Sequence, residues 1–335
     1  MPGGLVAVGG LSALKVVVTG GAGFVGANLC RVLGEESAVN QVVAIDDLST
    51  GLCSNLAGAK ARLVIGSVLD RELLDSVVAG ASAIVHLAAL PSVPRSLADP
   101  LASHAANATG TVHVLEAARR AGGPLVILAS SSSVYGSNPE LPKHEGLTPM
   151  PMSPYAASKL ATEAYGLAFQ QSFGLPVLAF RFFNIFGPLQ PAGHAYAAVI
   201  PAFVSSALAR QPLTIFGDGK QSRDFTYVET VAAVIKRSVL NAVTSTTPVN
   251  LAYGTRTHLL SVVALLEGIL GYPLEVRHAP ARVGDVRHSR ADNGRLLELL
   301  PEVCPVDFGD GLKATVDWFR AVSGAADVAG HRAGV

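Results

Sequence analysis

The fold class follows from one segment near the N-terminus, Lys15-Val16-Val17-Val18-Thr19-Gly20-Gly21-Ala22-Gly23-Phe24-Val25-Gly26. Its first half is a short valine-rich run, which predicts a buried strand, and a helical pattern begins where the segment ends. The glycines at 20, 23 and 26 allow a tight turn, because they carry no Cβ to block the approach of other backbone or of a ligand. A strand, a glycine turn and a helix in this order are typical of a parallel α/β sheet that binds a dinucleotide.

An acidic residue after the next predicted strand indicates which dinucleotide binds. Asp46 lies about twenty residues beyond Gly26, where a carboxylate binds the adenosine ribose hydroxyls and repels a 2′-phosphate, so NAD is the predicted cofactor. The alternative is a glycine turn that serves packing alone. The predicted cofactor-binding residues lie on the turn and after neighbouring strands, apart from Asn107, which lies in a helical pattern. They are Gly20, Gly23, Phe24, Val25, Gly26, Asp46, Asp47, Ser67, Val68, Leu87, Ala88, Ala89 and Asn107.

Strands and helices continue to alternate up to about residue 181. Runs that are apolar on both faces predict buried strands at 15–19, 41–45, 62–65, 83–86, 125–129 and 177–181. Helical patterns between them cover 26–33, 71–79, 101–121 and 154–173. This alternation predicts an α/β fold, a Rossmann-type doubly wound parallel sheet with helices on both faces.

A smaller C-terminal lobe is predicted after residue 181, where prolines and glycines interrupt the rhythm. The expected division is an NAD-binding domain at 14–181 and a mainly substrate-binding lobe at 182–320. Parts of 225–255, including a helical run at 228–240, are expected to pack back on the sheet. Residues 1–13 and 323–335 are expected to be flexible tails.

Bulk composition argues against several classes of protein. Of 335 residues, 50% are hydrophobic and 15% are charged, and 25 basic residues balance 25 acidic ones without a basic cluster, so neither nucleic acid nor an anionic membrane is an expected partner. No uncharged window reaches the roughly 20 apolar residues of a membrane span, and the apolar start lacks the basic region of a signal peptide. The three scattered cysteines fit a cytoplasmic location. His86 has no partner at ligand spacing, so it is interpreted as a packed residue and no metal is predicted.

A candidate proton-transfer pair lies in the predicted helix 154–173. Tyr155 and Lys159 are one helical turn apart and share a face. A phenol titrates near pH ~10, and a neighbouring cation favours the phenolate, which is the form that can act as a general base. Such a pair alone is more often structural. The glycine turn and the serines at 130–133 favour a catalytic role here.

Several blocks in a fixed order resemble the extended short-chain dehydrogenases, and within them the NAD-dependent epimerases and dehydratases of nucleotide sugars. Besides the glycine turn, they are Ser130-Ser131-Ser132-Ser133-Val134-Tyr135-Gly136, Ser153-Pro154-Tyr155-Ala156-Ala157-Ser158-Lys159, Arg181-Phe182-Phe183-Asn184, Gly217-Asp218-Gly219-Lys220-Gln221-Ser222-Arg223-Asp224-Phe225 and Arg282-Val283-Gly284-Asp285-Val286-Arg287-His288-Ser289. The resemblance covers residues 15–319.

The resemblance implies the roles of the catalytic residues. Tyr155 takes a proton from a sugar hydroxyl, and Lys159 lowers the pKa of Tyr155 and binds the nicotinamide ribose, so both also contact the cofactor. Ser131 binds the reacting oxygen, and Ser132 and Ser133 beside it are further catalytic candidates; the alternative is a serine turn that satisfies only its own backbone.

Substrate-binding residues are also implied by the resemblance. Arg223 and Arg282 are similar to ligands of a diphosphate, whose oxygens suit a planar guanidinium, and Asp285 is similar to a ligand of the uridine ribose. The full predicted set is Ser92, Val93, Ser131, Tyr155, Asn184, Gln190, Ala198, Val199, Arg223, Arg282, Asp285 and Ser289.

The serine run narrows the reaction. Dehydratases of this kind carry an Asp-Glu pair where this chain has Ser132 and Ser133, and related decarboxylases place a Glu there. The expected reaction is therefore C4 epimerisation of a UDP-hexose through a transient 4-keto sugar. A nucleotide-sugar dehydrogenase, reductase or dehydratase is the alternative, and a non-catalytic nucleotide sensor is a second one.

The sugar and the assembly are also expectations from the resemblance, which is nearest to bacterial UDP-N-acetylglucosamine 4-epimerases. A small residue at 289 leaves room for an acetamido group, so UDP-GlcNAc and UDP-GalNAc are the expected substrate pair. UDP-Glc and UDP-Gal are expected either as additional substrates or as the actual pair. The alternative for Ser289 is that it only caps a helix. Pro91 in place of a usual glycine and Ser67 in place of a usual aspartate depart from the pattern. A homodimer is expected through a four-helix bundle of 101–121 and 154–173.

Overall fold

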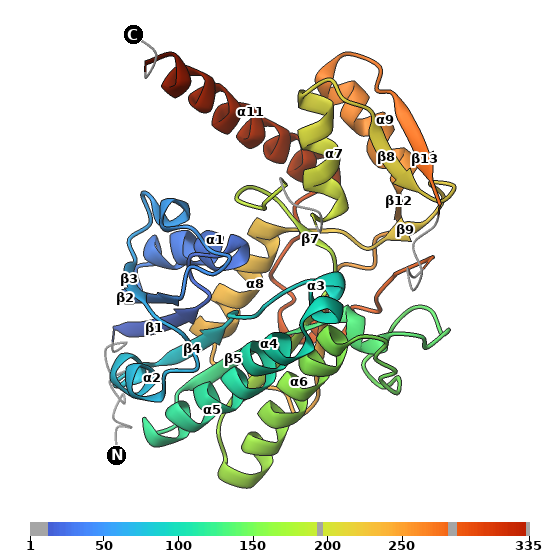
Figure 1. Ribbon diagram of the computed structural model, residues 1–335. Helices are drawn as coiled ribbons and strands as arrows, with labels where there is room; N and C mark the ends of the chain where they lie inside the picture. The colour runs from blue at the N-terminus through green and yellow to red at the C-terminus, as the bar shows by residue number, and fades with distance from the viewer. Residues whose placement is uncertain (1–12, 193–196, 281–286, 333–335) are drawn as a thin grey trace, which may run out of the picture.

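A seven-stranded parallel sheet forms the centre of the molecule (Figure 1), in the order β11-β6-β5-β4-β1-β2-β3. The computed structural model describes residues 13–192, 197–280 and 287–332, with side chains up to residue 322. The strands are β1 (Leu14–Thr19), β2 (Val39–Asp46), β3 (Arg62–Ile65), β4 (Ala83–His86), β5 (Leu125–Ser131), β6 (Val177–Phe182) and β11 (Val249–Leu251). The doubly wound sheet predicted from the sequence is confirmed.

Helices cover both faces of this sheet because successive strand residues point to opposite sides. Val16 and Val18 of β1 pack with α1 (Phe24–Gly34) and α8 (Val228–Leu240), whereas Val17 packs with α2 (Arg71–Val78) and α5 (Gly110–Arg120). The helix at 228–240 therefore packs back on the sheet, and the short strand β11, which the sequence did not reveal, extends the sheet beyond β6.

One expectation about these elements was wrong. The segment at 62–65 is not buried on both faces, because β3 is the edge strand and the side chain of Ile65 is 64% exposed. The helix expected at 101–121 is present, but a π-helical turn η2 (Ala105–Thr109) divides it into α4 (Pro100–His104) and α5. Helix α6 spans Pro154–Phe173 as expected.

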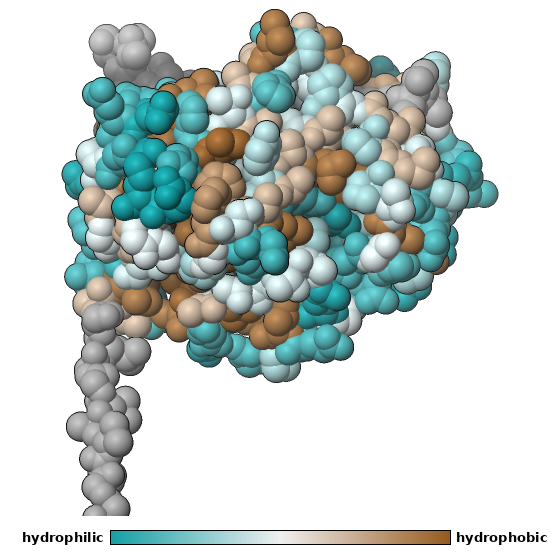
Figure 2. Space-filling model, turned by 90° about the horizontal axis from the view of Figure 1, so that it is seen from below, coloured by the Kyte–Doolittle hydropathy of each residue, from teal (hydrophilic) through white to brown (hydrophobic). Residues whose placement is uncertain are grey.

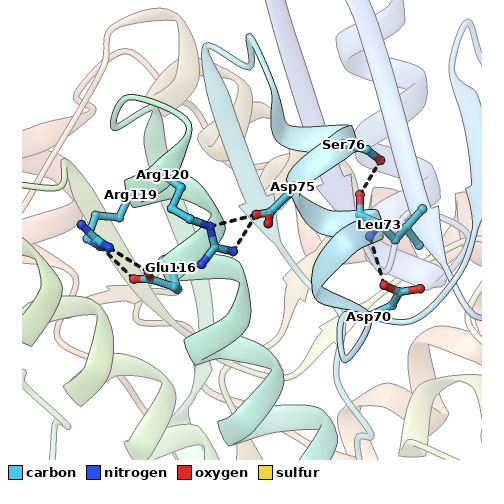
Figure 3. A network of polar contacts seen from close by, with 7 residues as sticks. All are labelled: Asp70, Leu73, Asp75, Ser76, Glu116, Arg119 and Arg120. Carbon is cyan, nitrogen blue, oxygen red and sulfur yellow. Dashed lines mark hydrogen bonds and ion pairs between the residues drawn. The ribbon is translucent and has the colours of Figure 1, made fainter.

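A network of charged side chains ties α2 to α5 at the surface (Figure 3). The Arg120 guanidinium donates to Asp75 Oδ1 of α2 at 2.6 Å and to Glu116 Oε1 of its own helix at 3.2 Å. Asp70 caps α2 by accepting from the backbone N–H of Leu73 at 3.0 Å. Exposed ion pairs contribute about 0–1 kcal/mol each, so this network orients two helices that the buried core already holds.

The remaining elements form a smaller lobe with its own hydrophobic core. Three two-stranded sheets pair β7 (Ile185–Phe186) with β10 (Thr226–Tyr227), β8 (Leu213–Phe216) with β13 (Val276–Ala279), and β9 (Ser222–Arg223) with β12 (Thr257–His258). Its helices are α7 (Val199–Leu208) and α9 (Leu259–Leu270), and α10 (Gly294–Leu299) follows β13. Helix α11 (Phe308–Arg332) continues over much of the segment expected as a tail, and Figure 1 shows it projecting from the body. None of the helices within the described ranges is long and apolar enough to cross a membrane.

Candidate active site

A cavity of about 620 Å³ lies at the carboxyl ends of the parallel strands, where doubly wound sheets bind their ligands. It runs from the glycine turn after β1 to the first turns of α6. The predicted site residues that line it are Gly20, Gly23, Phe24, Val25, Gly26, Asp46, Asp47, Ser67, Val68, Leu87, Ala88, Ala89, Ser131, Tyr155, Lys159, Asn184 and Gln190.

The glycine turn leaves no room for side chains. Gly20 adopts a φ of +69°, and a Cβ added there would lie 2.7 Å from the Ala88 nitrogen. A Cβ on Gly26 would lie 2.1 Å from the Gly20 carbonyl oxygen, so the start of α1 sits directly against the turn. Gly23 is the N-cap of α1 and has no side chain to cap the helix. The first backbone N–H groups of α1 are therefore free to bind an anion in the cavity.

Asp46 completes the fit to a dinucleotide. Its Oδ2 accepts from the Ala22 N–H and its Oδ1 from the Leu48 N–H, both at 2.9 Å, so the carboxylate orders the loops on each side. Each carboxylate oxygen can accept a further bond, which suits a pair of ribose hydroxyls. The turn, the uncapped helix and this carboxylate together fit NAD.

Tyr155 occupies the first turn of α6, where Ser153 caps the helix by accepting from the Ala156 N–H at 3.1 Å. Burial raises the pKa of the Tyr155 phenol, and a hydrogen bond from Ser131 acts in the opposite direction. The net direction is opposite to the lowering expected from Lys159, because desolvation outweighs the other contributions.

Lys159 lies one turn further along α6 and is only 5% exposed. Its Nζ donates to the Ala129 carbonyl of β5 at 2.8 Å, and burial lowers the pKa of the ammonium to about 8. A second contact fixes the helix at this place, since Ser130 Oγ donates to the Lys159 carbonyl at 3.2 Å. The cation is therefore held on the strand that carries Ser131.

A buried ion pair fastens the rest of α6 to β6. Arg181 donates to both carboxylate oxygens of Glu163, at 2.6 and 3.0 Å, and both side chains are 3% exposed. The Arg181 guanidinium also stacks 4.7 Å from the Tyr135 ring centre, and the Tyr135 hydroxyl donates to Asn250 Oδ1 at 2.7 Å. The helix that carries Tyr155 and Lys159 thus has little freedom to move relative to the sheet.

Ser132 and Ser133, predicted as catalytic, are not among the residues that line the cavity. They lie on the 3₁₀ turn η3 (Ser132–Tyr135), which follows β5. Ser131 Oγ accepts two bonds from Ser133, from its backbone N–H at 3.1 Å and from its hydroxyl at 2.9 Å. Ser133 therefore contacts a cavity residue and not the cavity.

Asn107, predicted to contact the cofactor, lies behind the cavity wall. It is 1% exposed; its Oδ1 accepts from the Leu90 N–H at 2.7 Å, and its Nδ2 donates to Ser158 Oγ at 2.9 Å. The π-helical turn η2 presents this side chain between the loop after β4 and α6. Asn107 thus positions Leu90 and Pro91, which do line the cavity.

A second cavity of about 250 Å³ adjoins the first and shares Asn184 and Ile185 with it. Arg223, Ala198 and Val199 of the predicted substrate set line this second cavity. Asn184 adopts a φ of +30° and donates from Nδ2 to the Asp224 carbonyl at 3.1 Å, which fixes its amide between the two spaces.

The other predicted substrate residues lie elsewhere. Ser92 caps the short helix α3 (Val93–Ala98), so Ser92 and Val93 follow the lining residue Pro91 without lining the cavity themselves. Ser289 donates its backbone N–H to the Ser222 carbonyl at 3.1 Å and lines neither cavity. Arg282 and Asp285 lie outside the described residues.

Some lining residues were not predicted from the sequence. Ser49 and Thr50 lie in the loop after β2, and their position after a strand could have predicted them as site residues. The alanines on α4 and η2 have no polar group from which a role could be predicted. The unpredicted lining residues include Ser49, Thr50, Ala102, Ala105, Ala106, Ser130, Phe182 and Ile185.

His86 is a packed residue, as interpreted from the sequence. It is 3% exposed between Thr19 Oγ1 at 2.7 Å and Thr111 Oγ1 at 3.1 Å. Burial lowers the pKa of its imidazole to about 3, so the ring is neutral at physiological pH. Within the described residues no three His, Cys, Asp or Glu side chains come together as metal ligands.

Known proteins share this architecture over nearly the whole chain. A UDP-glucose 4-epimerase from Mycolicibacterium smegmatis is 35% identical over 314 residues, covering 92% of this chain and 99% of the relative. A dTDP-glucose 4,6-dehydratase from Streptomyces niveus is 34% identical over 322 residues, covering 92% and 93%. A solved UDP-N-acetylglucosamine 4-epimerase from Methanobrevibacter ruminantium M1, in complex with UDP-N-acetylmuramic acid, has a TM-score of 0.87 and 35% identity and covers 92% of this chain and 99% of that one. Since the model of the NAD dependent epimerase/dehydratase family matches residues 16–252, the chain belongs to this family.

Proposed function

We propose that this protein is an NAD-dependent UDP-sugar 4-epimerase. The observation that carries the proposal is the distribution of ionisable groups along the cavity. Tyr155 and Lys159 line one end. The carboxylates among its described lining residues are Asp46, which ends β2, and Asp47, which follows it. Three strand spacings, or roughly 14 Å, separate β2 from β5, so these carboxylates belong to the cofactor turn and not to the sugar.

The proton chemistry at the sugar then falls to two side chains. NAD, when bound, supplies a reversible hydride acceptor for the C4 carbon. Tyr155 takes the proton of the 4-hydroxyl as the carbon is oxidised, and Ser131 donates a hydrogen bond to the same oxygen. After the 4-keto sugar has turned its other face to the cofactor, Tyr155 returns the proton. The cycle leaves no net proton or electron behind.

Elimination of water has no such support in the cavity. Elimination needs an acid and a base beside the carbons that lose the hydroxide and the proton. Ser132 and Ser133 occupy the positions at which the dehydratases that this chain resembles carry carboxylates. A serine hydroxyl is too weak an acid and base for that task. The relation to the Streptomyces niveus dehydratase therefore reflects shared fold and cofactor chemistry.

The proposed sugar pair is UDP-GlcNAc and UDP-GalNAc, with UDP-Glc and UDP-Gal as further substrates. The similarity to the Methanobrevibacter ruminantium M1 and Mycolicibacterium smegmatis epimerases supports these pairs. Relative kcat/KM on the two pairs decides between them. Because Ser289 lines neither cavity, a Ser289→Tyr variant tests whether this residue acts on the sugar at all. Selective loss of the acetylated pair would support that role, and an equal loss on both pairs would remove Ser289 from the argument.

The decisive experiment incubates the purified protein with UDP-GlcNAc or UDP-Glc without added NAD and identifies the products by NMR. C4 epimers without net NADH formation are expected. A 4-keto-6-deoxy product, or turnover that consumes external NADH stoichiometrically, would overturn the proposal.

Tyr155→Phe should lower kcat by about 10³-fold while the protein retains NAD, because a positioned general base contributes about 10²–10⁴-fold. Tyr165→Phe, at a 46% exposed tyrosine on the same helix, is the matched control and should keep full activity. If neither nucleotide sugar reacts and Tyr155→Phe changes nothing, the sensor alternative replaces this proposal.

We also propose that two copies associate through α4, α5 and α6 in a cytoplasmic homodimer. These helices lie side by side on one face of the sheet (Figure 1). Seen from below in Figure 2, hydrophobic residues gather in patches among hydrophilic ones. Leu101 on α4 is 80% exposed and Phe173 at the end of α6 is 55% exposed, as expected of a face that a partner covers.

A further inference from the structure

We propose that Ser133 is a positioning residue that fixes the Ser131 hydroxyl as a hydrogen-bond donor toward Tyr155 and the reacting oxygen. This inference deepens the proposed epimerase chemistry and rests on it. The geometry begins with the two bonds that converge on Ser131 Oγ, from the Ser133 N–H at 3.1 Å and from the Ser133 hydroxyl at 2.9 Å.

A hydroxyl oxygen has two lone pairs and one hydrogen. When both lone pairs of Ser131 Oγ accept from Ser133, the single hydrogen of Ser131 must point away from the turn. Ser131 lines the cavity together with Tyr155, and its hydrogen bond stabilises the Tyr155 phenolate. Ser133 thereby determines the direction of the hydrogen bond that Ser131 donates, although Ser133 is not a partner in that bond.

The turn that carries Ser133 is rigid. Val134 and Tyr135, which follow it, are 0% and 1% exposed. The Ser133 carbonyl accepts from the Gly136 N–H at 3.1 Å, and a Cβ on Gly136 would lie 1.7 Å from the Met150 carbonyl oxygen. Burial and this hydrogen bond hold the turn in place, which keeps the Ser133 hydroxyl within reach of Ser131.

A fixed donor suits a reversible redox step. The oxygen at C4 gains negative character each time its proton passes to Tyr155 and loses it when the proton returns. The single Ser131 hydrogen, directed away from the turn, can donate to whichever oxygen carries the charge, the phenolate before the transfer and the C4 oxygen after it. Without the Ser133 hydroxyl one lone pair of Ser131 is freed, and its hydrogen can rotate away from Tyr155. The other titratable groups among the described lining residues are Lys159, Asp46 and Asp47, and none of them takes part in this bond.

Three variants separate this role from a structural one. Ser133→Ala removes the hydroxyl and keeps the backbone bond, Ser133→Thr restores a hydroxyl at the same place, and Ser137→Ala changes a nearby serine as the control. Ser137 is exposed just beyond the turn and is not among the residues that line the cavity. Removal of a whole oxyanion donor costs about 10²–10³-fold in kcat, so misdirection of one should cost about tenfold.

The test measures kcat and KM for C4 epimerisation across pH, and titrates the Tyr155 phenolate in NAD-loaded protein by difference absorbance against Tyr155→Phe. In Ser133→Ala we expect kcat to fall about tenfold with KM unchanged, and the Tyr155 titration to move to higher pH. Ser133→Thr should recover most of both, and Ser137→Ala should match the wild type.

An unmoved Tyr155 titration in Ser133→Ala would overturn the inference, even if kcat falls, because only a structural role would remain. A wild-type rate in Ser133→Ala would overturn it as well. The titration needs no turnover, so it still tests Ser133 if no UDP-sugar is epimerised, and the two failures can be told apart.

Discussion

Lys159 illustrates at the residue scale how a reactive group reduces stability. Its side chain is 5% exposed, and the Ala129 carbonyl accepts from Nζ, yet burial still lowers the pKa of the ammonium to about 8. The folded state therefore binds this proton less tightly than the unfolded chain, whose lysines titrate near pH 10.5. Below pH 8 the buried charge opposes folding, and the effect fades as pH rises from 8 to 10.5.

Lys159→Met should consequently stabilise the NAD-free protein while it abolishes catalysis. We expect a gain of about 1–3 kcal/mol in the free energy of unfolding at pH 7, since a shift of one pKa unit corresponds to ~1.4 kcal/mol and the lost bond to Ala129 offsets part of it. The gain should shrink at pH 10. Urea unfolding at both pH values checks this, and a loss of stability at pH 7 would show that the bond to Ala129 outweighs desolvation.

The residues at the cofactor turn could be predicted because their constraints are local. Gly20, Gly26 and Asp46 act through backbone space and strand ends that follow from the order of the elements. The function of Ser133 could not be predicted, because it depends on which lone pairs of Ser131 are occupied. The contacts of Asn107 could not be predicted for a related reason, since they depend on the turn η2, which directs its side chain to the Leu90 backbone.

At the scale of elements, His86 joins three of them, because β4 carries it between Thr19 of β1 and Thr111 of α5. The pKa of its imidazole is about 3, against 6.5 in the unfolded chain, so above pH 6.5 the ring is neutral in both states and adds no pH dependence to stability. As pH falls from 6.5 toward 3, the unfolded chain takes up a proton that the folded state refuses, so stability is lost in that window.

His86→Gln should remove this part of the acid sensitivity. The difference in unfolding free energy between wild type and variant should shrink by up to about 1.4 kcal/mol per pH unit below 6.5. Urea unfolding between pH 7 and 4 measures it, and His104→Gln at an exposed position on α4 controls for the loss of a histidine as such. Equal slopes in wild type and His86→Gln would contradict the assignment.

Helices were predicted correctly where a long periodic pattern of apolar residues marks them. Examples are α6 and α8, whose observed bounds agree with those predicted from the sequence. Burial of a strand was not predictable in the same way. Leu63, Val64 and Ile65 are as apolar as a central strand, but their exposure depends on the strand order, which places β3 at the edge. Helix 101–121 carries a continuous pattern, yet the contacts of Asn107 with Leu90 and Ser158 accompany a π-helical turn within it.

At the scale of the whole molecule, the proposed dimer predicts how a single surface change should act. Leu101→Glu places a carboxylate on an 80% exposed position of α4, and a two-fold interface would bury it twice without a partner. We expect the variant to be monomeric at micromolar concentration by light scattering, with an unchanged circular dichroism spectrum. Leu265→Glu on α9 of the smaller lobe, at 40% exposure, is the matched control and should stay dimeric. A monomeric wild type, or a dimer that survives Leu101→Glu, would exclude this interface, because an unpaired buried carboxylate costs several kcal/mol.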